Sequence, residues 1–272
     1  MSNAAGSKTL VQQQFGANAA HYVTSPTHAT GASLARVVEL AGPKKDWHAL
    51  DIATGAGHMA LAFAPRVAEV IASDLTPQMI AQAASLAAER GLSNVRTAIA
   101  DSEALPFEDG QFDLVSCRIA PHHFTDIPRF VAEAWRVLKP NGTFALVDNI
   151  SPDATTSPGF SEEELAAADV RYNLFEKIRD PSHGRALTAA AWRGLLAEAG
   201  FVIAHQELMT KSMAFRTWCN NMAVPPDVER RIEDMLEHAG ACLGAFLRSR
   251  TEADGERAFS LHELVLIARK PT

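Results

Sequence analysis

The sequence predicts an α/β fold with a doubly wound, seven-stranded, mostly parallel sheet and helical lid insertions. Short apolar runs alternate with helix-like stretches between residues 47 and 147, the pattern of repeated strand, helix and strand units. A glycine-rich turn follows the first of these runs, at 54–57. Three successive runs end in an acid, namely Asp51, Asp74 and Asp101. Ligands of such sheets bind where the strands end, so these acids are candidate binding residues.

Composition and charge limit the class of protein. With 272 residues, of which 47% are hydrophobic and 21% charged, the chain is long enough for one globular domain with insertions, which we place at residues 7–272. Its formal net charge of −7, without a run of Lys or Arg, argues against binding to nucleic acid or to an anionic membrane surface. We therefore expect a small-molecule substrate. A homodimer is compatible with these features.

Targeting segments and metal sites are not expected. No apolar segment approaches the roughly 20 residues of a membrane span, and the start of the chain lacks the charged and apolar regions of a signal peptide. The 3 cysteines are far apart, which fits free thiols in a reducing cytosol. The 10 histidines form no cluster with Asp or Glu at ligand spacing, so no metal is expected. Together these features predict a cytoplasmic protein.

Two helix-like stretches precede the first strand. In residues 11–22, Phe15 and Tyr22 are separated by two helical turns and share one face. This face either anchors the segment on the core or covers a bound ligand, where a ring near a cation gains cation–π attraction. From 31 to 41 apolar residues recur at helical spacing, and Gly42 followed by proline ends that helix.

The first strand, residues 47–51, ends in Asp51 and leads into the glycine turn. Gly55 and Gly57 let the backbone approach a ligand, and with Ala60 they satisfy the G-x-G-x-x-G/A pattern of dinucleotide-binding proteins. Such proteins usually keep this strand apolar up to the turn. A carboxylate at the strand end instead suits a ligand with a positive charge, such as an amine or a sulfonium. An NAD-dependent oxidoreductase stays as a remote alternative.

The second and third strands also end in acids. Residues 68–73 precede Asp74, which follows Gly55 by about 20 residues, the spacing at which an acid accepts ribose hydroxyls in nucleotide-binding folds. Residues 95–100 precede Asp101. A single acid at a strand end is often a solvated loop residue, whereas three in succession indicate a binding site.

The fourth strand, residues 111–117, leads into the loop RIAPHHFTD at 118–126. Because this loop follows a parallel strand, we expect it to face the ligand pocket. A helix at 127–138 and a turn at 139–142 precede the fifth strand, which we place at 143–147.

Two insertions interrupt the last part of the sheet, at 151–187 and 214–254, and we expect them to form a helical lid above the strand ends. The first insertion begins in a stretch rich in Ser, Pro and Thr. Ser161 and Glu164 then make a capping box that opens a helix. The two remaining strands are expected at 201–208 and 261–269.

Several stretches resemble class I methyltransferases that use S-adenosylmethionine (SAM). DIATGAG and SDLTPQMI are similar to the glycine motif and its successor in that family, and ADSEALPF and VLKPNGTFALVD are similar to later elements. From Phe15 to about Asn149 the chain resembles the small-molecule type related to the quinone-biosynthesis C-methyltransferases. CRIAPHHF, LVDN and RDPSHGRA place it closer to an uncharacterised subgroup. The quinone enzymes usually carry an Arg-Asn pair where this chain has Arg118 and Ile119, which argues against a quinone substrate.

The resemblance implies SAM as the methyl donor and S-adenosylhomocysteine (SAH) as the product. It implies that Asp101 accepts a hydrogen bond from the adenine amine, and that the FGxxAxxY segment folds over the cofactor. The predicted cofactor-binding residues are Phe15, Tyr22, Asp51, Thr54, Gly55, Gly57, Asp74, Leu75, Met79, Asp101, Ser102 and Arg118.

A catalytic base is needed only where the acceptor must lose a proton, because the sulfonium of SAM is already activated. His122 and His123 are the predicted catalytic residues, since an imidazole is partly deprotonated at neutral pH, and His122 is slightly preferred. Both are equally compatible with polar loop positions. His183, with Arg179 and Arg185, is an alternative set for binding an acidic or phenolic substrate, although a solvated loop is the favoured interpretation of these residues.

The predicted function is therefore methyl transfer from SAM to a carbon or an oxygen of a small-molecule acceptor. The alternative is a protein of the same fold that binds SAM or SAH without methyl transfer. The acceptor atom and the substrate do not follow from the sequence.

Overall fold

This computed structural model describes residues 4–24 and 31–272, and the side chains of 4, 5, 17, 18 and 20–24 lie outside this description. The chain divides into two compact units. The first comprises Met1–Asp148, Arg193–Glu207 and Val265–Thr272, and the second comprises Asn149–Trp192 and Leu208–Leu264. The predicted insertions at 151–187 and 214–254 fall within the second unit, and their role as a lid stays a prediction.

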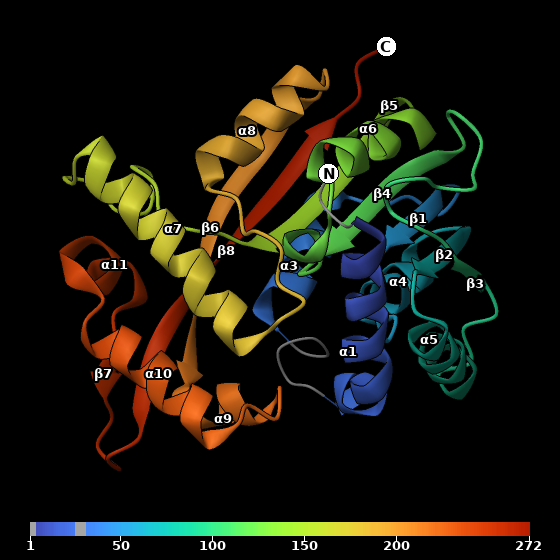
Figure 1. Ribbon diagram of the computed structural model, residues 1–272. Helices are drawn as coiled ribbons and strands as arrows, with labels where there is room; N and C mark the ends of the chain where they lie inside the picture. The colour runs from blue at the N-terminus through green and yellow to red at the C-terminus, as the bar shows by residue number, and fades with distance from the viewer. Residues whose placement is uncertain (1–3, 25–30) are drawn as a thin grey trace. The chain divides into compact units, whose positions relative to one another are not determined.

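The strands form one sheet in the order β3-β2-β1-β4-β5-β8-β6, and the short strand β7 pairs with β8 (Figure 1). The seven-stranded path confirms the predicted fold, and β7 adds a two-residue strand that is too short for a sequence pattern. β1 pairs in parallel with β2 and β4, β2 with β3, and β4 with β5. The bounds are β1 His48–Ile52, β2 Glu69–Asp74, β3 Val95–Ile99, β4 Phe112–Arg118, β5 Leu138–Asn149, β6 Val202–Ala214, β7 Arg250–Thr251 and β8 Arg257–Arg269.

The later strands are longer than the sequence predicts. β5 extends the expected 143–147 at both ends, β6 continues past residue 208, and β8 begins before residue 261. The turn sequence at 139–142 hides the start of β5, because lysine, proline, asparagine and glycine are all poor strand formers. Hydrophobic patterning locates the strand centres and misses their ends.

Strand β1 lies at the centre of the parallel part of the sheet. Ala49 and Leu50 point to opposite faces of the sheet and are both buried, as expected for a strand covered on both faces. The register pairs Asp51 with Ala72 on β2 and with Ser116 on β4. Because parallel strands end at the same edge of the sheet, the end of β1 is bordered by the ends of β2 and β4. The chain order reverses between β1 and β4, which is where ligands bind in open α/β sheets.

Helices of the first unit connect these strands. Figure 1 shows α1, in dark blue, beside α5, and residues of the two helices are in contact. The first helix runs over Ala4–Thr24, longer than the predicted 11–22. Within the described residues no helix is long and apolar enough to cross a membrane. The other bounds are α3 Ala32–Ala41, α4 His58–Phe63, η1 Ala64–Arg66, α5 Pro77–Glu89, η2 Pro121–His123, α6 Ile127–Val137 and α8 Ala189–Glu198.

The second unit has its own aromatic core. Phe175 of α7 stacks on Trp218 of α9 at 4.9 Å between ring centroids, and Phe259 of β8 meets the edge of the same indole. Ser161 and Glu164 form the predicted capping box at the start of α7. Helix α7 packs against α10 and α11 (Figure 1). The bounds are α7 Glu162–Arg179, α9 Phe215–Asn220, α10 Pro226–Glu237 and α11 Gly240–Leu247.

Candidate active site

Buried carboxylates gather at the carboxyl ends of the parallel strands. Asp51 is the last residue but one of β1, Asp74 ends β2 and Asp148 lies near the end of β5, and all three are buried. Burial raises the pKa of the Cys117 thiol on β4, and the charges of Asp51, Asp148 and Asp74 raise it further. The thiol therefore lies within electrostatic reach of acids from three different strands, so these acids share one region of the first unit.

The glycine turn after β1 requires backbone conformations that other residues adopt at a cost. Gly55 has φ +56° and Gly57 has φ +90°, both in the left-handed region. A Cβ at Gly57 would lie 2.9 Å from the Cβ of Ala83 on α5, so this glycine also permits close packing. A Cβ at Gly55 would meet no described atom within 4 Å. The backbone at Gly55 is therefore open on the side that a side chain would otherwise fill.

Asp51 is held by two hydroxyl groups. Ser116 Oγ donates to its Oδ1 at 2.6 Å, and Thr54 Oγ1 donates to its Oδ2 at 2.5 Å. The residue is only 1% exposed. Burial raises the pKa of the Asp51 carboxyl to about 6, while the two hydroxyls and the charge of Arg118 favour its ionised form. The carboxylate is thus fixed in orientation and mostly charged at neutral pH.

Asp74 ties the glycine turn to the end of β2. Its Oδ2 accepts a hydrogen bond from the backbone N–H of Gly55 at 2.9 Å, and its Oδ1 accepts from that of Thr76 at 2.8 Å. Burial raises its pKa, and these backbone donors partly offset the effect. Each carboxylate oxygen has a second lone pair, so the same group can also accept from a ligand. Its predicted contact with ribose stays a prediction.

Asp101 has a partner that the sequence pattern did not indicate. Lys8 Nζ of α1 lies 2.6 Å from Asp101 Oδ2 and 2.7 Å from Glu103 Oε2. Gln12, also on α1, donates to the carbonyl oxygen of Leu75 at 2.9 Å. Helix α1 therefore contacts the ends of both β2 and β3. These contacts join residues far apart in the chain, which explains why local patterns missed them.

The two predicted catalytic histidines have different surroundings. His122 Nδ1 lies 2.6 Å from Asp148 Oδ1, and His122 is 7% exposed. His123 is less buried, and its ring meets the edge of Phe15 with centroids 4.9 Å apart. A carboxylate only accepts hydrogen bonds, so Nδ1 of His122 carries a proton, and in the neutral imidazole the lone pair is then on Nε2. The carboxylate of Asp148 thus fixes the orientation of the His122 imidazole.

Asp148 is a site residue that the sequence analysis did not single out. It belongs to the stretch VLKPNGTFALVD, whose acid near the end of the fifth strand follows the same rule as Asp51 and Asp74. The available signal was therefore an acid at the end of a buried strand. Its pairing with His122 depends on the neighbouring positions of β4 and β5, which are paired in parallel.

The other residues predicted to bind the cofactor differ in burial and in their contacts within the protein. Met79 is buried in the first turn of α5, and Ser102 is partly exposed beside Asp101. Arg118 Nη1 lies 3.4 Å from Ser33 Oγ on α3. The side chain of Tyr22 lies outside the described residues. None of these environments by itself assigns a ligand contact.

The alternative set consists of His183, Arg179 and Arg185. These side chains make contacts within the second unit. Arg185 pairs with Asp169 at 2.5 Å, and the guanidinium of Arg179 lies 4.4 Å from the centre of the Trp218 ring. His183 Nε2 lies 3.0 Å from the side-chain oxygen of Asn173. These three side chains therefore order the loop after α7. Within residues 4–24 and 31–272, no group of His, Cys, Asp and Glu has the arrangement of a metal site.

The comparisons with known proteins agree with this geometry. A family model described as a methyltransferase domain matches residues 50–146. The chain is 35% identical to the uncharacterized methyltransferase YcgJ of Bacillus subtilis over 225 residues, which cover 83% of this chain and 85% of the relative. The chain belongs to the class I SAM-dependent methyltransferases. This methyltransferase contains the glycine turn, Asp51 and Asp74 within the matched domain.

Two further matches show how much of the chain is similar to other methyltransferases. A solved structure from Bacillus halodurans C-125, named as a proposed methyltransferase, has a TM-score of 0.80 and 36% identity, and covers 89% of this chain and 100% of its own. A demethylmenaquinone methyltransferase of Thermus thermophilus is 41% identical over 115 residues, which cover 42% of this methyltransferase and 52% of that relative. The similarity to the quinone enzyme is thus confined to part of each chain.

Proposed function

We propose that this methyltransferase methylates a carbon or an oxygen of a small-molecule acceptor that must lose a proton, and that His122 takes this proton. The observation that carries the proposal is the buried contact of 2.6 Å between His122 Nδ1 and Asp148 Oδ1. When bound, SAM supplies a methyl group on a sulfonium, so its thioether leaves without protonation. The protein then has to orient the acceptor and remove its proton.

The residues at the ends of β1 and β2 fit SAM. Asp51 is an oriented carboxylate that is charged at neutral pH, which suits the amino group of the cofactor. The open backbone at Gly55 allows close approach of a ligand. In this proposal Asp74 keeps the turn in place and accepts from the ribose hydroxyls with its second lone pairs. The chemistry of these groups matches the charges and donors of the cofactor.

The His122 and Asp148 pair fits general-base catalysis. Asp148 holds the imidazole in the tautomer whose lone pair is on Nε2, and it stabilises the imidazolium that forms when the proton arrives. In the balanced reaction, the acceptor X–H gives its proton to His122 Nε2, and its electron pair forms the new X–CH₃ bond. The electron pair of the S–CH₃ bond stays on sulfur. An amine acceptor that is already neutral would not need this pair, which favours an acidic hydroxyl or a carbon acid.

The test compares His122→Gln with His123→Gln. Acceptors that carry phenol, enol or activated C–H groups are screened with wild-type enzyme, and the methylated product and SAH are measured by mass spectrometry. We expect His122→Gln to reduce turnover by about 10²–10⁴-fold. His123→Gln should change it by less than about tenfold, because the proposal gives the proton to His122, while the ring of His123 packs against Phe15.

Two outcomes would contradict the proposal. Equal effects of the two variants would remove the distinction on which the assignment of His122 depends. Stoichiometric SAH binding without product from any acceptor would favour the alternative of a protein that binds the cofactor without methyl transfer. Calorimetric titration with SAH, performed on each variant, confirms that the cofactor site is intact.

A further inference from the structure

One face of α1 contacts the ends of three parallel strands. Lys8, Gln12 and Phe15 recur at intervals of about one helical turn, so their side chains form one stripe along the helix. Lys8 reaches the acids that follow β3, and Gln12 donates to the carbonyl oxygen of Leu75, directly after β2. Phe15 packs in an edge contact against the ring of His123, after β4. The position of α1 is thus linked to the loop that carries both histidines.

Glu103 connects Lys8 to the end of that loop, residues 118–126, which we call the histidine loop. The side chain of Glu103 is 8% exposed, and its carboxylate lies 2.7 Å from Lys8 Nζ. Thr125 donates to this carboxylate with its backbone N–H, at 2.8 Å, and with its hydroxyl, at 2.7 Å. The backbone N–H of Asp126 donates to it at 3.0 Å. One carboxylate therefore joins α1 to the last two residues of the histidine loop.

The carboxylate of Glu103 is held in its ionised form. Burial alone would raise its pKa, but hydrogen bonds from Lys8, Thr125 and Asp126 outweigh burial and lower the pKa below its usual value. Lys8 Nζ also lies 2.6 Å from Asp101, so one ammonium group contacts two carboxylates. Two carboxylates this close to one cation repel each other once the cation is removed. Lys8 therefore stabilises the arrangement in which Glu103 holds the loop.

The histidine loop is held at three points. At its start, the backbone N–H of Ile119 donates to the carbonyl oxygen of Val147 at 2.8 Å. In its middle, His122 Nδ1 lies 2.6 Å from Asp148 Oδ1. Its end is the part that Glu103 holds. The first two points are contacts with β5, whereas the third reaches α1.

We propose that Lys8 and Glu103 are positioning residues, which hold the end of the histidine loop so that His122 faces the acceptor. This inference rests on the proposed role of His122 as the base. Lys8 and Glu103 touch neither the acceptor nor the reacting atoms, and they act on the reaction through the position of His122. A displacement of a catalytic group by about 1 Å can cost about a hundredfold in rate. Helix α1 thereby contributes to turnover through the contacts of Lys8.

The first experiment measures kcat, acceptor KM and SAH affinity for Lys8→Met, with an acceptor that the wild type methylates. We expect kcat to fall about 10–100-fold at unchanged SAH affinity, because the end of the loop loses its fixed position while the acids of the cofactor site stay in place. Lys8→Arg keeps the charge and should recover most of the activity. Lys45→Met is the matched control, since Lys45 is an exposed lysine of the first unit that donates to the carbonyl oxygen of Pro65.

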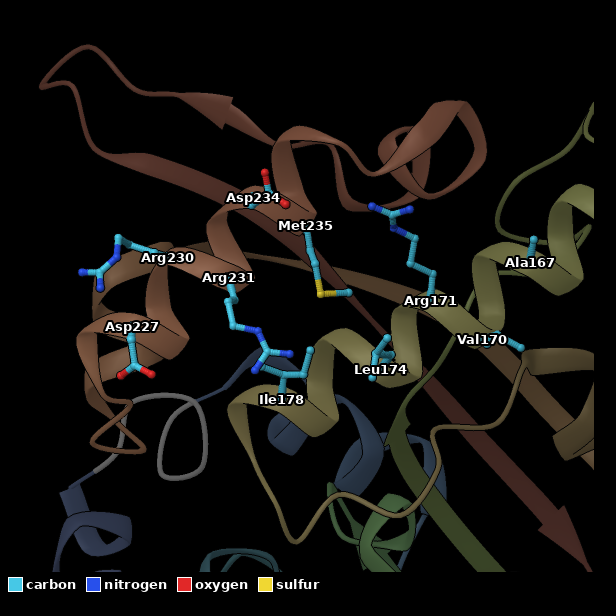
Figure 2. A pocket seen from close by; sticks show the side chains of 10 residues that line it. All are labelled: Ala167, Val170, Arg171, Leu174, Ile178, Asp227, Arg230, Arg231, Asp234 and Met235. Carbon is cyan, nitrogen blue, oxygen red and sulfur yellow. The ribbon is translucent and has the colours of Figure 1, made fainter.

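A second control removes a cation from the second unit. Arg230 is exposed on α10 and lines the groove between α7 and α10 (Figure 2). Arg230→Met changes the net charge of the protein as Lys8→Met does, and it should leave kcat unchanged. Equal losses in the two variants would trace the effect to net charge and would contradict the role of the Lys8 contacts.

The second experiment follows the histidine loop directly and needs no acceptor. Hydrogen exchange, measured by mass spectrometry, reports on the backbone N–H groups of residues 119–126, several of which donate within the protein. Exchange in this segment should be faster in Lys8→Met and in Glu103→Gln than in the wild type, and it should be unchanged in Lys45→Met. Thermal unfolding of each variant confirms that it is folded.

The outcomes separate this inference from the proposed function. Unchanged exchange at 119–126 in Lys8→Met would overturn the inference, whatever the role of His122. A loss of SAH affinity as large as the loss of kcat would also overturn it, because it would place Lys8 in the cofactor site. Faster exchange in Lys8→Met combined with full turnover in His122→Gln would show that the proposed base is wrong, while the anchoring of the loop by Lys8 would stand.

Discussion

The ends of β1 and β2 and the ends of β4 and β5 hold buried carboxylates in contrasting ways. Asp51 and Asp74 accept hydrogen bonds mainly from hydroxyl and backbone N–H groups of nearby turns. Asp148 is paired with an imidazole 26 positions earlier in the chain. In the function proposed above, the first arrangement keeps an anion available for a cationic ligand, and the second orients a base. One edge of the sheet thus carries two different chemistries.

The comparison predicts that variants of the two sides fail in different ways. Changes at β1 and β2 should alter cofactor affinity, whereas changes at β4 and β5 should alter turnover at unchanged affinity.

Asp148→Asn should reduce turnover by about 10²–10⁴-fold. Asparagine can donate to Nδ1 and so favour the tautomer with the wrong nitrogen protonated. Because Asp148 acts through His122, the pH profile of turnover should also change once the anionic partner of the imidazole is gone. SAH affinity should stay the same, and Asp148→Glu should recover part of the activity. An unchanged pH profile would make Asp148 a purely structural residue.

Asp51→Asn should weaken SAH binding by about 10–100-fold, because it removes a charge-assisted hydrogen bond to the amino group of the cofactor. The measurement is calorimetric titration at pH 7.5, with Ser116→Ala as a control that keeps the charge and removes one hydroxyl donor. We expect the control to lose less affinity than the aspartate variant. Equal losses would mean that orientation of the carboxylate matters more than its charge.

The same Asp51→Asn variant should be more stable than the wild type at neutral pH. The folded-state pKa of Asp51, about 6, lies above the value of 3.8 for the free side chain, so folding favours the protonated form. The contribution of this group to stability is complete below about pH 4 and is lost as the pH rises through about 6. At pH 7.5 the variant should gain about 1–3 kcal/mol in free energy of unfolding.

Urea unfolding at pH 7.5 and near pH 4 tests the direction of this change in stability. The gain should be present at pH 7.5 and should disappear near pH 4, where the wild-type carboxyl is also neutral. A variant that is less stable than the wild type at both pH values would show that the hydroxyl contacts outweigh the cost of burying the charge.

Ile119→Asn should stabilise the protein by about 1 kcal/mol. Ile119 follows β4 with φ +54°, a left-handed conformation that β-branched side chains rarely adopt and asparagine tolerates. Ile119→Val keeps the branching and should give no gain. Equal stabilities of the Asn and Val variants would show that the backbone is not strained.

The fold and the β1 and β2 side of the site were predictable because the residues that mark them recur in short, recognisable stretches of sequence. Asp51, Thr54 and Gly55 lie within one strand and turn, and Asp74 ends the next strand, so spacing alone places them together. The sheet order then follows from the repeated strand and helix pattern. A sequence displays these spacings directly, whereas the hydrogen bond from Ser116 on β4 to Asp51 joins positions 65 residues apart and was not predicted.

The β4 and β5 side could be predicted only in part. His122 was a candidate from its position after a parallel strand, but nothing in its neighbourhood separates it from His123. The distinction comes from Asp148, which the sheet brings to His122 from another strand. Lys8 and Asp101 illustrate the same limit, since their 2.6 Å contact joins positions 93 residues apart. Long-range pairs of this kind depend on the assembled fold.

The most direct test of the contrast is calorimetric titration of SAH into the wild type, Asp51→Asn and His122→Gln under one set of conditions. We predict that the wild type and His122→Gln bind with the same affinity, while Asp51→Asn binds about 10–100-fold more weakly. This result would separate a cofactor side at β1 and β2 from a proton-accepting side at β4 and β5. Equal weakening in both variants would contradict the division, because it would place His122 in the cofactor site.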